Sequence, residues 1–378
     1  MREKIKYIVN EEVPGRAIAA RDLTQYENIK RVMQNAHIRE LEKHLSRDVF
    51  DYIVESMRDF DDAYVVDSES IFNIDIIHAE QNVIINVHKI NDIRYVNKYF
   101  EAINRKLVKG GMITGCVEIY RQRKKRILRK HHPLISYPLY WGDFVVKRIF
   151  PKLKLTQWIY FFLTRGQNRA ISREEAFGRL YSCGFKIVSE KDINNILYFS
   201  FEKVSKPKYD TEPTYGPFVK LKRVGKDGVI FNVSKFRTMY AYSEYLQDYV
   251  YENNNLAEGG KFQDDFRITG WGRVLRKFWL DELPMLWNVM KGQMKIVGVR
   301  PLSKQYFNLY DKKVQEKRVK FKPGLVPPYY VDMPKTIEEI QSSEMRYLEA
   351  YERSPWKTQW VYFWKAMWNI LVKRARSS

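Results

Sequence analysis

DDFRITGWGRVLRKFWLDELPMLWNVMKGQMKIVGVRP occupies residues 264–301. At its centre lie two adjacent carboxylates, Asp281 and Glu282, with a basic segment before them and an apolar segment after them. Asp281 precedes Pro284 by three residues and Gly292 follows the apolar run, which is the expected order of an N-cap, a first-turn proline and a C-terminal glycine. We therefore expect two helices that join at the acidic pair.

This position allows two interpretations of Asp281. As a capping carboxylate, it accepts a hydrogen bond from the first turn of the second helix. As a functional group, it uses the positive helix end, which keeps a carboxylate ionised and attracts a phosphate or a metal-bound diphosphate. Asp281 and Glu282 then supply a nucleophile and a metal ligand or proton-handling group. All histidines lie at or before His132, so chemistry in the C-terminal half depends on carboxylates, lysine, arginine or hydroxyls.

Cations lie upstream, in GPFVKLKRVGKDGVIFNVSKFRTM. This segment predicts two strands around a turn at Asp227 and Gly228, because Asp-Gly is a frequent hairpin turn. The second strand leads into Lys235 and Arg237. These two residues are either a solvated strand end or part of a phosphate-binding site.

Composition limits the class of protein. A chain of 378 residues favours two domains, and a formal charge of +21 predicts an anionic partner: nucleic acid, a phospholipid surface or phosphorylated substrates. Only two cysteines occur, Cys116 and Cys183, which suits a reducing compartment. The N-terminus has no signal-peptide pattern, and no apolar run approaches the roughly 18 residues of a spanning helix. We expect a cytoplasmic protein without a conventional transmembrane helix.

The N-terminal half alternates between helical and β-branched patterns. Residues 27–58 predict a helix. Short apolar runs follow at 63–66, 71–77 and 82–87, and a further helix is expected to end at Gly110-Gly111 before a strand. This alternation predicts an α/β layer.

Residues 73–204 resemble the second half of a Rossmann-like methyltransferase. The resemblance rests on RKLVKGGMITG, which is similar to the family's turn before a strand, and on EEAFGRLYSCGFKIVSE. The glycine-rich loop that would hold S-adenosylmethionine is missing, because nothing like G-x-G follows a strand before residue 82. A degenerate scaffold or partner-docking domain is therefore favoured over a working methyltransferase.

Inside this half, the basic run RQRKKRILRKHH at residues 121–132 precedes an aromatic-rich segment. The run is either a solvated face or part of a basic-aromatic surface lying on anionic lipid. Lipid is favoured over nucleic acid, because no RNP-like, zinc-finger or helix-turn-helix signature is present. The neighbouring aromatic residues are Tyr137, Tyr140, Trp141, Phe144, Trp158, Tyr160, Phe161 and Phe162.

A segment rich in proline, glycine and polar residues, VSKPKYDTEPTYGP, separates the two halves. The predicted organisation is a helical lead-in over residues 1–70, a degenerate methyltransferase-like α/β domain over 71–204, a linker over 205–217 and a second domain over 218–378.

The second domain resembles the bacterial sugar transferases known as monotopic phosphoglycosyl transferases. The resemblance covers residues 216–374. It rests on KRVGKDGVIFNVSKFRTM, on the series RIT, GR, LRK, LDELP, NV, KG, VG and RP, and on KPG at residues 322–324. It implies a helix-rich domain with a short β-hairpin, so the fold class is α/β for the first domain and α+β for the second. Val299 before Arg300 and Leu325 after KPG depart from the family pattern.

The resemblance implies an activity on the cytoplasmic face of the bacterial inner membrane. Such an enzyme transfers a sugar phosphate from a nucleotide diphosphosugar, here a UDP-sugar, to polyprenyl (undecaprenyl) phosphate, which begins the assembly of a capsular, exopolysaccharide or lipopolysaccharide glycan. Carried over, Asp281 forms a covalent phosphosugar intermediate, and Glu282 is its partner; both lie near Mg²⁺. The residues expected to hold phosphate are Lys235, Arg237, Arg276 and Arg300.

Attachment to the membrane must differ from the family pattern. A polar linker precedes the predicted hairpin, where the family has an apolar re-entrant helix, so we expect peripheral or monotopic attachment, or help from a partner subunit or homo-oligomer. Four tryptophans recur at four-residue spacing near the C-terminus, either as core packing or as an interfacial helix on an anionic membrane. They are Trp356, Trp360, Trp364 and Trp368.

Two alternatives to an active transferase stay open. One is a catalytically silent membrane-surface scaffold or regulator of glycan assembly. The other is a methyltransferase with an appended lipid-binding domain.

Overall fold

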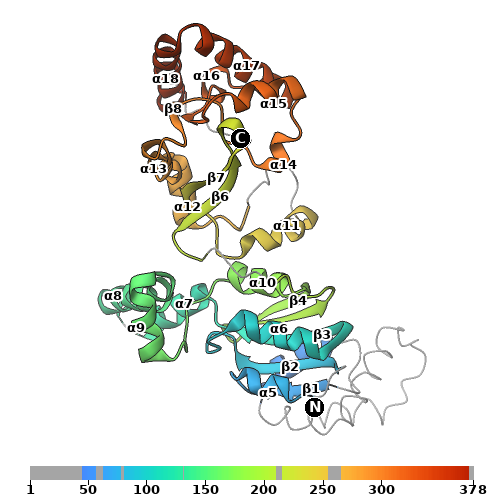
Figure 1. Cartoon of the computed structure of the whole chain (residues 1–378). Helices are drawn as coiled ribbons and strands as arrows, with labels where there is room; N and C mark the ends of the chain where they lie inside the picture. Colours follow the sequence, from blue (N-terminus) through green and yellow to red (C-terminus); the bar gives the residue numbers. More distant parts are fainter. Residues whose placement is uncertain are drawn as a thin grey trace, which may run out of the picture. The chain divides into compact units, whose positions relative to one another are not determined.

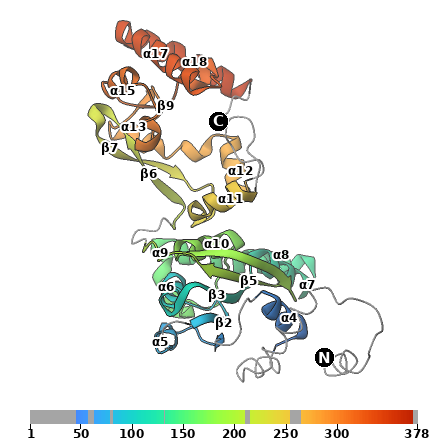
Figure 2. The same cartoon turned by 90° about the vertical axis from the view of Figure 1, so that its right-hand side faces the viewer.

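The computed structural model describes residues 45–56, 63–77, 81–130, 132–209, 215–253 and 265–373. The chain forms two compact units. The first contains Met1–Lys147, Phe162–Ile171 and Leu180–Tyr209, and the second contains Arg148–Phe161, Ser172–Arg179 and Asp210–Ser378. Figures 1 and 2 show the elements of each unit. Most of the helix expected at residues 27–58 lies outside the described residues.

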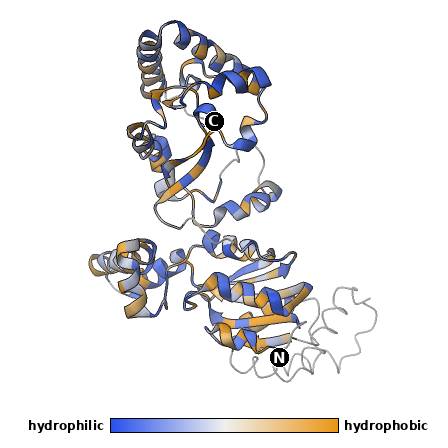
Figure 3. Cartoon of the chain, viewed as in Figure 1, coloured by the Kyte–Doolittle hydropathy of each residue, from blue (hydrophilic) through white to orange (hydrophobic). Residues whose placement is uncertain are grey.

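The first unit is built on one five-stranded sheet in the order β1-β2-β3-β5-β4. β1, β2 and β3 are parallel, and β5 runs antiparallel to both β3 and β4. β2 is hydrophobic over much of its length, as expected of a strand buried on both faces (Figure 3). This sheet confirms the predicted α/β layer. The strands are β1 (Ala63–Val66), β2 (Gln81–Lys89), β3 (Leu107–Val117), β4 (Phe185–Ile193) and β5 (Ile196–Lys203).

Two local interpretations in this unit are wrong. The apolar run at 71–77, which was grouped with the strand-like runs on either side of it, forms helix α5 (Ile71–Asp75). Helix α6 (Val96–Lys106) ends before Gly110, and β3 already begins at Leu107. Gly110 lies inside β3 and has a φ of +82°. Glycine in a left-handed conformation occurs at local irregularities of strands as well as at helix ends.

The predicted boundary between a helical lead-in and the α/β domain at residue 70 is also wrong. β1 lies before it and pairs with β2 in the sheet. Helix α4 (Arg47–Ser56) buries its apolar face against the same core, where Phe50 and Ile53 pack with Val83 and Ile85. Residues from 47 onward therefore belong to the α/β unit.

After β3 the chain makes several helices before returning to the sheet. Helix α7 (Tyr120–Lys130) contains residues 121–130 of the basic run. It is followed by α8 (Pro133–Phe144), η1 (Val145–Ile149), η2 (Phe150–Lys152), α9 (Lys154–Thr164) and α10 (Arg173–Ser182). Residues 121–130 are thus helical, and part of the run is tied to carboxylates: Arg123 pairs with Asp143 and Arg126 pairs with Glu118.

The second unit begins with the predicted hairpin. β6 (Phe218–Val224) pairs antiparallel with β7 (Ile230–Phe236) across the turn η3 (Lys226–Gly228), where Asp227 has a φ of 56°. Helices α12 (Gly270–Lys277) and α13 (Met285–Met290) follow, joined by the short helix η5 (Leu280–Glu282). The hairpin, and two helices meeting at the acidic pair, were both predicted. Between hairpin and helices lie η4 (Ser243–Leu246) and α11 (Gln247–Asn253).

The C-terminal part of this unit packs helices around a small parallel pair, β8 (Lys295–Val297) and β9 (Gly324–Val326). Gly298 and Gly324 lie so close that a Cβ at Gly324 would sit 2.0 Å from the Gly298 nitrogen. The segment after KPG, which departs from the family pattern, therefore forms a buried strand. The helices are α14 (Lys304–Phe307), α15 (Lys312–Val319), α16 (Tyr329–Asp332), α17 (Ile337–Arg353) and α18 (Pro355–Leu371).

The four tryptophans of α18 point outward. Trp356 is 88% exposed and Trp364 is 54% exposed, whereas Ala366 on the same helix is fully buried against the core. The core-packing interpretation of the tryptophan spacing is therefore wrong. Within the part of the chain that the structure describes, no helix is long and apolar enough to span a membrane.

The prediction of a single domain boundary at the linker is incomplete. The segments Arg148–Phe161 and Ser172–Arg179 belong to the second unit. Glu175, 1% exposed, holds them there by pairing with Arg148 (3.3 Å), Lys152 (2.9 Å) and Arg179 (3.0 Å). The Tyr215 hydroxyl, just before the hairpin, donates a further hydrogen bond to Glu175 at 3.2 Å. We call these residues the Glu175 cluster.

Candidate active site

The acidic pair lies in a single 3-10 turn between α12 and α13. The chain enters this turn through Trp279, whose φ of 59° is left-handed, and the N-cap of α13 is Pro284. The capping interpretation of Asp281 is therefore wrong, because neither helix end next to it receives a side-chain hydrogen bond from it. Of the two interpretations of Asp281, the functional one therefore remains.

Glu282 is held by a lysine from the hairpin. The Lys235 Nζ lies 2.6 Å from the Glu282 Oε1, and Glu282 is only 9% exposed. An ion pair of this length, largely removed from water, fixes both side chains more firmly than a surface pair would. The predicted placement of Lys235 beside the acidic pair is confirmed.

Asp281 lies in a different electrostatic environment. Burial raises its pKa, and the adjacent charge of Glu282 raises it further, while Lys235 and Arg276 lower it. Arg276 was predicted as a phosphate-binding residue, and the structure places its charge close enough to Asp281 for the two to influence each other. Asp281 is thus a partly desolvated carboxylate with cations nearby, which suits a nucleophile.

Close backbone packing positions Arg276. The Thr269 side chain caps α12 by accepting a hydrogen bond from the Gly272 N–H at 2.8 Å. A Cβ at Gly272 would lie 2.0 Å from the Thr238 carbonyl oxygen, so only glycine lets the helix approach this closely. Arg276 then donates from Nε to the Thr238 hydroxyl at 3.0 Å. The end of the KFRTM motif therefore orients the cation beside the nucleophile.

The sequence analysis missed Asn288, which fastens α13 to the hairpin. Its Nδ2 donates to the Asn232 carbonyl at 2.7 Å, and its Oδ1 accepts from the Ser234 N–H at 3.1 Å. Asn288 is 3% exposed, so these bonds are shielded from water. The NV motif is the sequence signal for this residue, although a lone Asn in an apolar helix does not reveal its partners.

A second missed element is the pair Asp265 and Arg267. Arg267 donates to both oxygens of Asp265, at 2.9 Å from Nε and 2.7 Å from its terminal nitrogen. These hydrogen bonds hold the pKa of Asp265 below its usual value although burial opposes them, and the charge of Arg276 contributes. The two members of this pair act on Arg276 in opposite directions: the Asp265 charge raises the pKa of Arg276, and the Arg267 charge lowers it, as burial does.

Two predicted phosphate-binding residues have other neighbours. Arg237 donates from Nε to the Gly216 carbonyl at 2.8 Å, and its electrostatic neighbours are Glu244 and Glu175. Burial lowers the pKa of Arg223, and the nearby charge of Arg300 lowers it further. Arg237 directly follows β7, and the charges that act on the pKa of Asp281 come from Glu282, Lys235 and Arg276. Phosphate binding by Arg237 and Arg300 stays a prediction.

The acidic pair fits a divalent cation only in part. Among the described residues, no group of three or more His, Cys, Asp or Glu side chains gathers at one point. Mg²⁺ needs fewer, because it usually binds one or two carboxylates together with substrate phosphates and water. Asp281, with Glu282 beside it, meets that requirement for a metal that arrives with a diphosphate.

The helices that carry the pair expose apolar side chains. On α12 and just after it, Trp271 is 68% exposed and Phe278 is 62% exposed. On α13, Trp287 is 56% exposed and Met290 is 76% exposed. Large exposed apolar groups clustered on two neighbouring helices indicate an interaction surface rather than chance exposure.

Comparison with known proteins identifies this unit. Residues 210–372 match the family described as bacterial sugar transferase. The matched part of the second unit, residues 210–372, is a bacterial sugar transferase domain. Over 133 residues the chain is 35% identical to a galactosyl transferase (CpsE) of Streptococcus agalactiae, a match that covers 34% of this chain and 29% of that protein.

Other relatives agree. The chain is 39% identical over 109 residues to an exopolysaccharide production protein (ExoY) of Sinorhizobium fredii, covering 28% of this chain and 48% of the relative. It is 42% identical over 85 residues to an undecaprenyl-phosphate galactose phosphotransferase of Salmonella typhimurium, and this match covers 21% of this chain and 18% of the relative. The match thus spans less than half the length of each of these relatives.

For the N-terminal unit the comparison is weak. An S-adenosylmethionine-dependent methyltransferase from Mesorhizobium loti aligns with 34% of this chain and 66% of its own, at 12% identity and a TM-score of 0.23. A likeness this slight carries no argument, so the resemblance to methyltransferases stays a prediction.

Proposed function

We propose that the C-terminal unit transfers a sugar phosphate from a UDP-sugar to undecaprenyl phosphate and so begins a bacterial surface glycan. The observation that carries this proposal is the partly desolvated Asp281 between the cations Lys235 and Arg276, next to exposed apolar helices. A phosphorylated substrate needs the cations, and a lipid substrate needs the apolar surface.

The reaction proceeds by two displacements at one phosphorus. A carboxylate oxygen of Asp281 attacks the phosphorus that bears the sugar, an Asp–O–P bond forms, and the P–O bond to the nucleoside monophosphate breaks. A phosphate oxygen of the lipid then attacks the same phosphorus, which releases the carboxylate and leaves a lipid diphosphosugar. Lys235 and Arg276 stabilise the charge that spreads over the phosphoryl oxygens.

Glu282 acts as a positioning residue. Its ion pair fixes the Lys235 ammonium at the site, and its charge raises the pKa of Asp281. Asp281 and Glu282 would hold Mg²⁺, which neutralises diphosphate charge and so assists the leaving group. Arg300 and Arg223 form a second cationic site on the same unit, suited to a phosphate group.

The assay mixes full-length protein with UDP-sugars, undecaprenyl phosphate and MgCl₂ and measures UMP release. We expect turnover by wild type and a loss of at least about 10³-fold for Asp281→Asn. Asp227→Asn, at the hairpin turn, is the matched control and retains turnover. No UMP release by wild type, or equal release by Asp281→Asn, would contradict the proposal and favour a silent scaffold.

We further propose that the domain contacts an anionic membrane surface through its exposed aromatic side chains, on the cytoplasmic face. Aromatic residues prefer the interface, where the ring is partly in lipid and the polar edge stays wet. α18 offers Trp356 and Trp360, and α12 offers Trp271 and Phe278.

Vesicle flotation tests this surface. Burial of one large apolar side chain is worth about 1.5–3 kcal/mol, so the double variants Trp356→Ala/Trp360→Ala and Trp271→Ala/Phe278→Ala should each weaken binding to phosphatidylglycerol vesicles by at least about tenfold. Val229→Ser, an exposed apolar residue at the hairpin turn, is the control. Wild-type binding by both double variants would show that these side chains are not the contact surface.

A further inference from the structure

The first unit has a pocket at the carboxyl end of its parallel strands. Lys89 is the last residue of β2, and Glu118 directly follows β3. Both line an open cavity of about 780 Å³. In open α/β sheets, ligands bind outside the carboxyl ends of the strands, where loops from neighbouring strands diverge.

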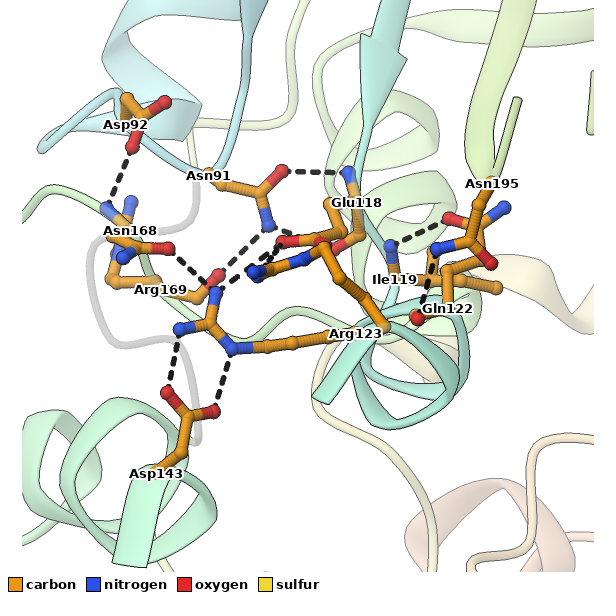
Figure 4. Close-up of polar contacts among 11 residues, drawn as sticks. Asn91, Asp92, Glu118, Ile119, Gln122, Arg123, Asp143, Asn168, Arg169 and Asn195 are labelled. Atoms are coloured by element: carbon orange, nitrogen blue, oxygen red, sulfur yellow. Dashed lines mark hydrogen bonds and ion pairs between the residues drawn. The ribbon is translucent and has the colours of Figure 1, made fainter. Parts of the chain in front are cut away.

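A polar network joins lining residues of this pocket to the loops that follow β2 and β3 (Figure 4). Asn91, 2% exposed, donates to the carbonyls of Glu118 and Arg169, both at 2.8 Å, and accepts from the Glu118 N–H at 2.8 Å. Arg126 donates to both oxygens of Glu118, at 2.6 and 3.1 Å. The loops that follow β2 and β3 are thereby fastened to each other.

Three asparagines with left-handed backbone line the pocket wall. Asn168, Asn194 and Asn195 have φ values of 58°, 52° and 63°. Asn194 and Asn195 form the two-residue turn between β4 and β5, where left-handed asparagine is common. Hydrogen bonds hold two of these asparagines. The Asn168 backbone N–H donates to the Asp92 carboxylate at 2.7 Å, and the Asn195 side-chain amide donates to the Gln122 carbonyl oxygen at 2.9 Å.

The charges in the pocket do not balance. Its lining includes four cations and two carboxylates. Glu118 is occupied by Arg126, whereas Lys89, Arg129 and Lys130 form no ion pair with any residue that the structure describes. Three cations without carboxylate partners, facing one cavity, would attract an anion such as a phosphate group.

The rest of the lining selects among anions. Besides the cations it offers the side-chain amides of Gln167, Asn168, Asn194 and Asn195, and none of its described residues is aromatic. Amides bind hydroxyl groups, and a nucleobase would need a ring to stack on. We propose that this pocket binds a small phosphorylated sugar, with the phosphate at Arg129 and Lys130 and the hydroxyls at the amides. This site lies in the first unit, and the inference does not depend on the transferase activity.

Calorimetric titration of the full chain with glucose 1-phosphate tests the site, with glucose and inorganic phosphate as comparison ligands. The test variant is Arg129→Gln/Lys130→Gln. The matched control is Lys109→Gln/Lys125→Gln, which removes the same charge from exposed positions outside the pocket, at the amino end of β3 and on α7.

We expect wild type and the control to bind glucose 1-phosphate, and the test variant to bind it at least about tenfold more weakly. Glucose alone should give no heat at the same concentrations. Absence of binding to wild type, or equal binding by both double variants, would overturn the site. Equal affinity for inorganic phosphate and glucose 1-phosphate would overturn the assignment of a sugar.

Discussion

Two carboxylate sites in the second unit use the same residue types with opposite results. Glu175 lies among Arg148, Lys152 and Arg179, and these cations hold its pKa well below the usual value although burial opposes them. Asp281 has cations nearby as well, but burial and the charge of Glu282 raise its pKa. The first carboxylate is neutralised and fastens the chain, whereas the second keeps a charge that is available to a substrate.

The largest expected effect comes from removing the charge of Glu175. Glu175→Gln removes the buried carboxylate that pairs with Arg148, Lys152 and Arg179, so we expect the free energy of unfolding to fall by about 3–5 kcal/mol. Asp281→Asn should not lower it, because that change removes a charge whose burial is unfavourable. Thermal melts followed by circular dichroism measure both; equal losses would show that the two sites do not differ in this way.

A smaller effect is expected from Lys235, the cation that the acidic site shares with its substrate. Lys235→Met should lower kcat/KM by about 10²-fold, the usual cost of removing one stabilising donor from a transition state. Lys222→Met, on the paired strand β6 and exposed, is the control and should stay near wild-type activity. Steady-state UMP release distinguishes them, and an active Lys235→Met variant would remove this lysine from the mechanism.

The smallest effect is a shift in pH dependence. A nucleophile must be ionised, so the acid limb of kcat/KM should lie at higher pH than an ordinary aspartate would give. Lys235 lowers the pKa of Asp281, and Lys235→Met should therefore move that limb to still higher pH. An unmoved limb would contradict the assignment.

The contribution of Glu175 to stability should be lost at lower pH than activity. The folded pKa of Glu175 is depressed, so its contribution is present above the unfolded pKa and is lost only as the pH falls through the folded value. Glu175 should therefore stay ionised over the pH range in which activity is lost, and its contribution to the melting temperature should not change there. Melts recorded at the same pH values as the kinetics check this contrast.

The sequence predicted the parts of the site that depend on local pattern. The Asp-Gly hairpin and the two helices around Asp281 follow from turn and capping chemistry, which acts over a few residues. The partners of the arginines did not follow, because Arg237 and Arg300 reach Gly216 and the vicinity of Arg223 through tertiary packing. The Glu175 cluster was missed for the same reason: Arg148 and Lys152 precede Glu175 by 27 and 23 residues.

Strand and helix boundaries failed where apolar residues fit either structure. The run at 71–77 forms a helix although it is rich in isoleucine, since its position between β1 and β2 requires a crossover connection. Gly110 predicted a helix end but lies within β3, because a left-handed glycine is also used at irregular strand positions. The tryptophan spacing predicted a helix correctly without indicating which face is buried.

The left-handed backbone at Trp279 constrains how this domain can adapt to heat. A non-glycine residue in that conformation costs about 1–2 kcal/mol, and the Trp279 ring is retained by its edge-on packing against Tyr330, with centroids 6.1 Å apart. Glycine there would remove the strain, but it would also remove the ring and add freedom to the turn that carries Asp281. Variants selected for thermal tolerance should therefore accumulate changes elsewhere and keep this residue.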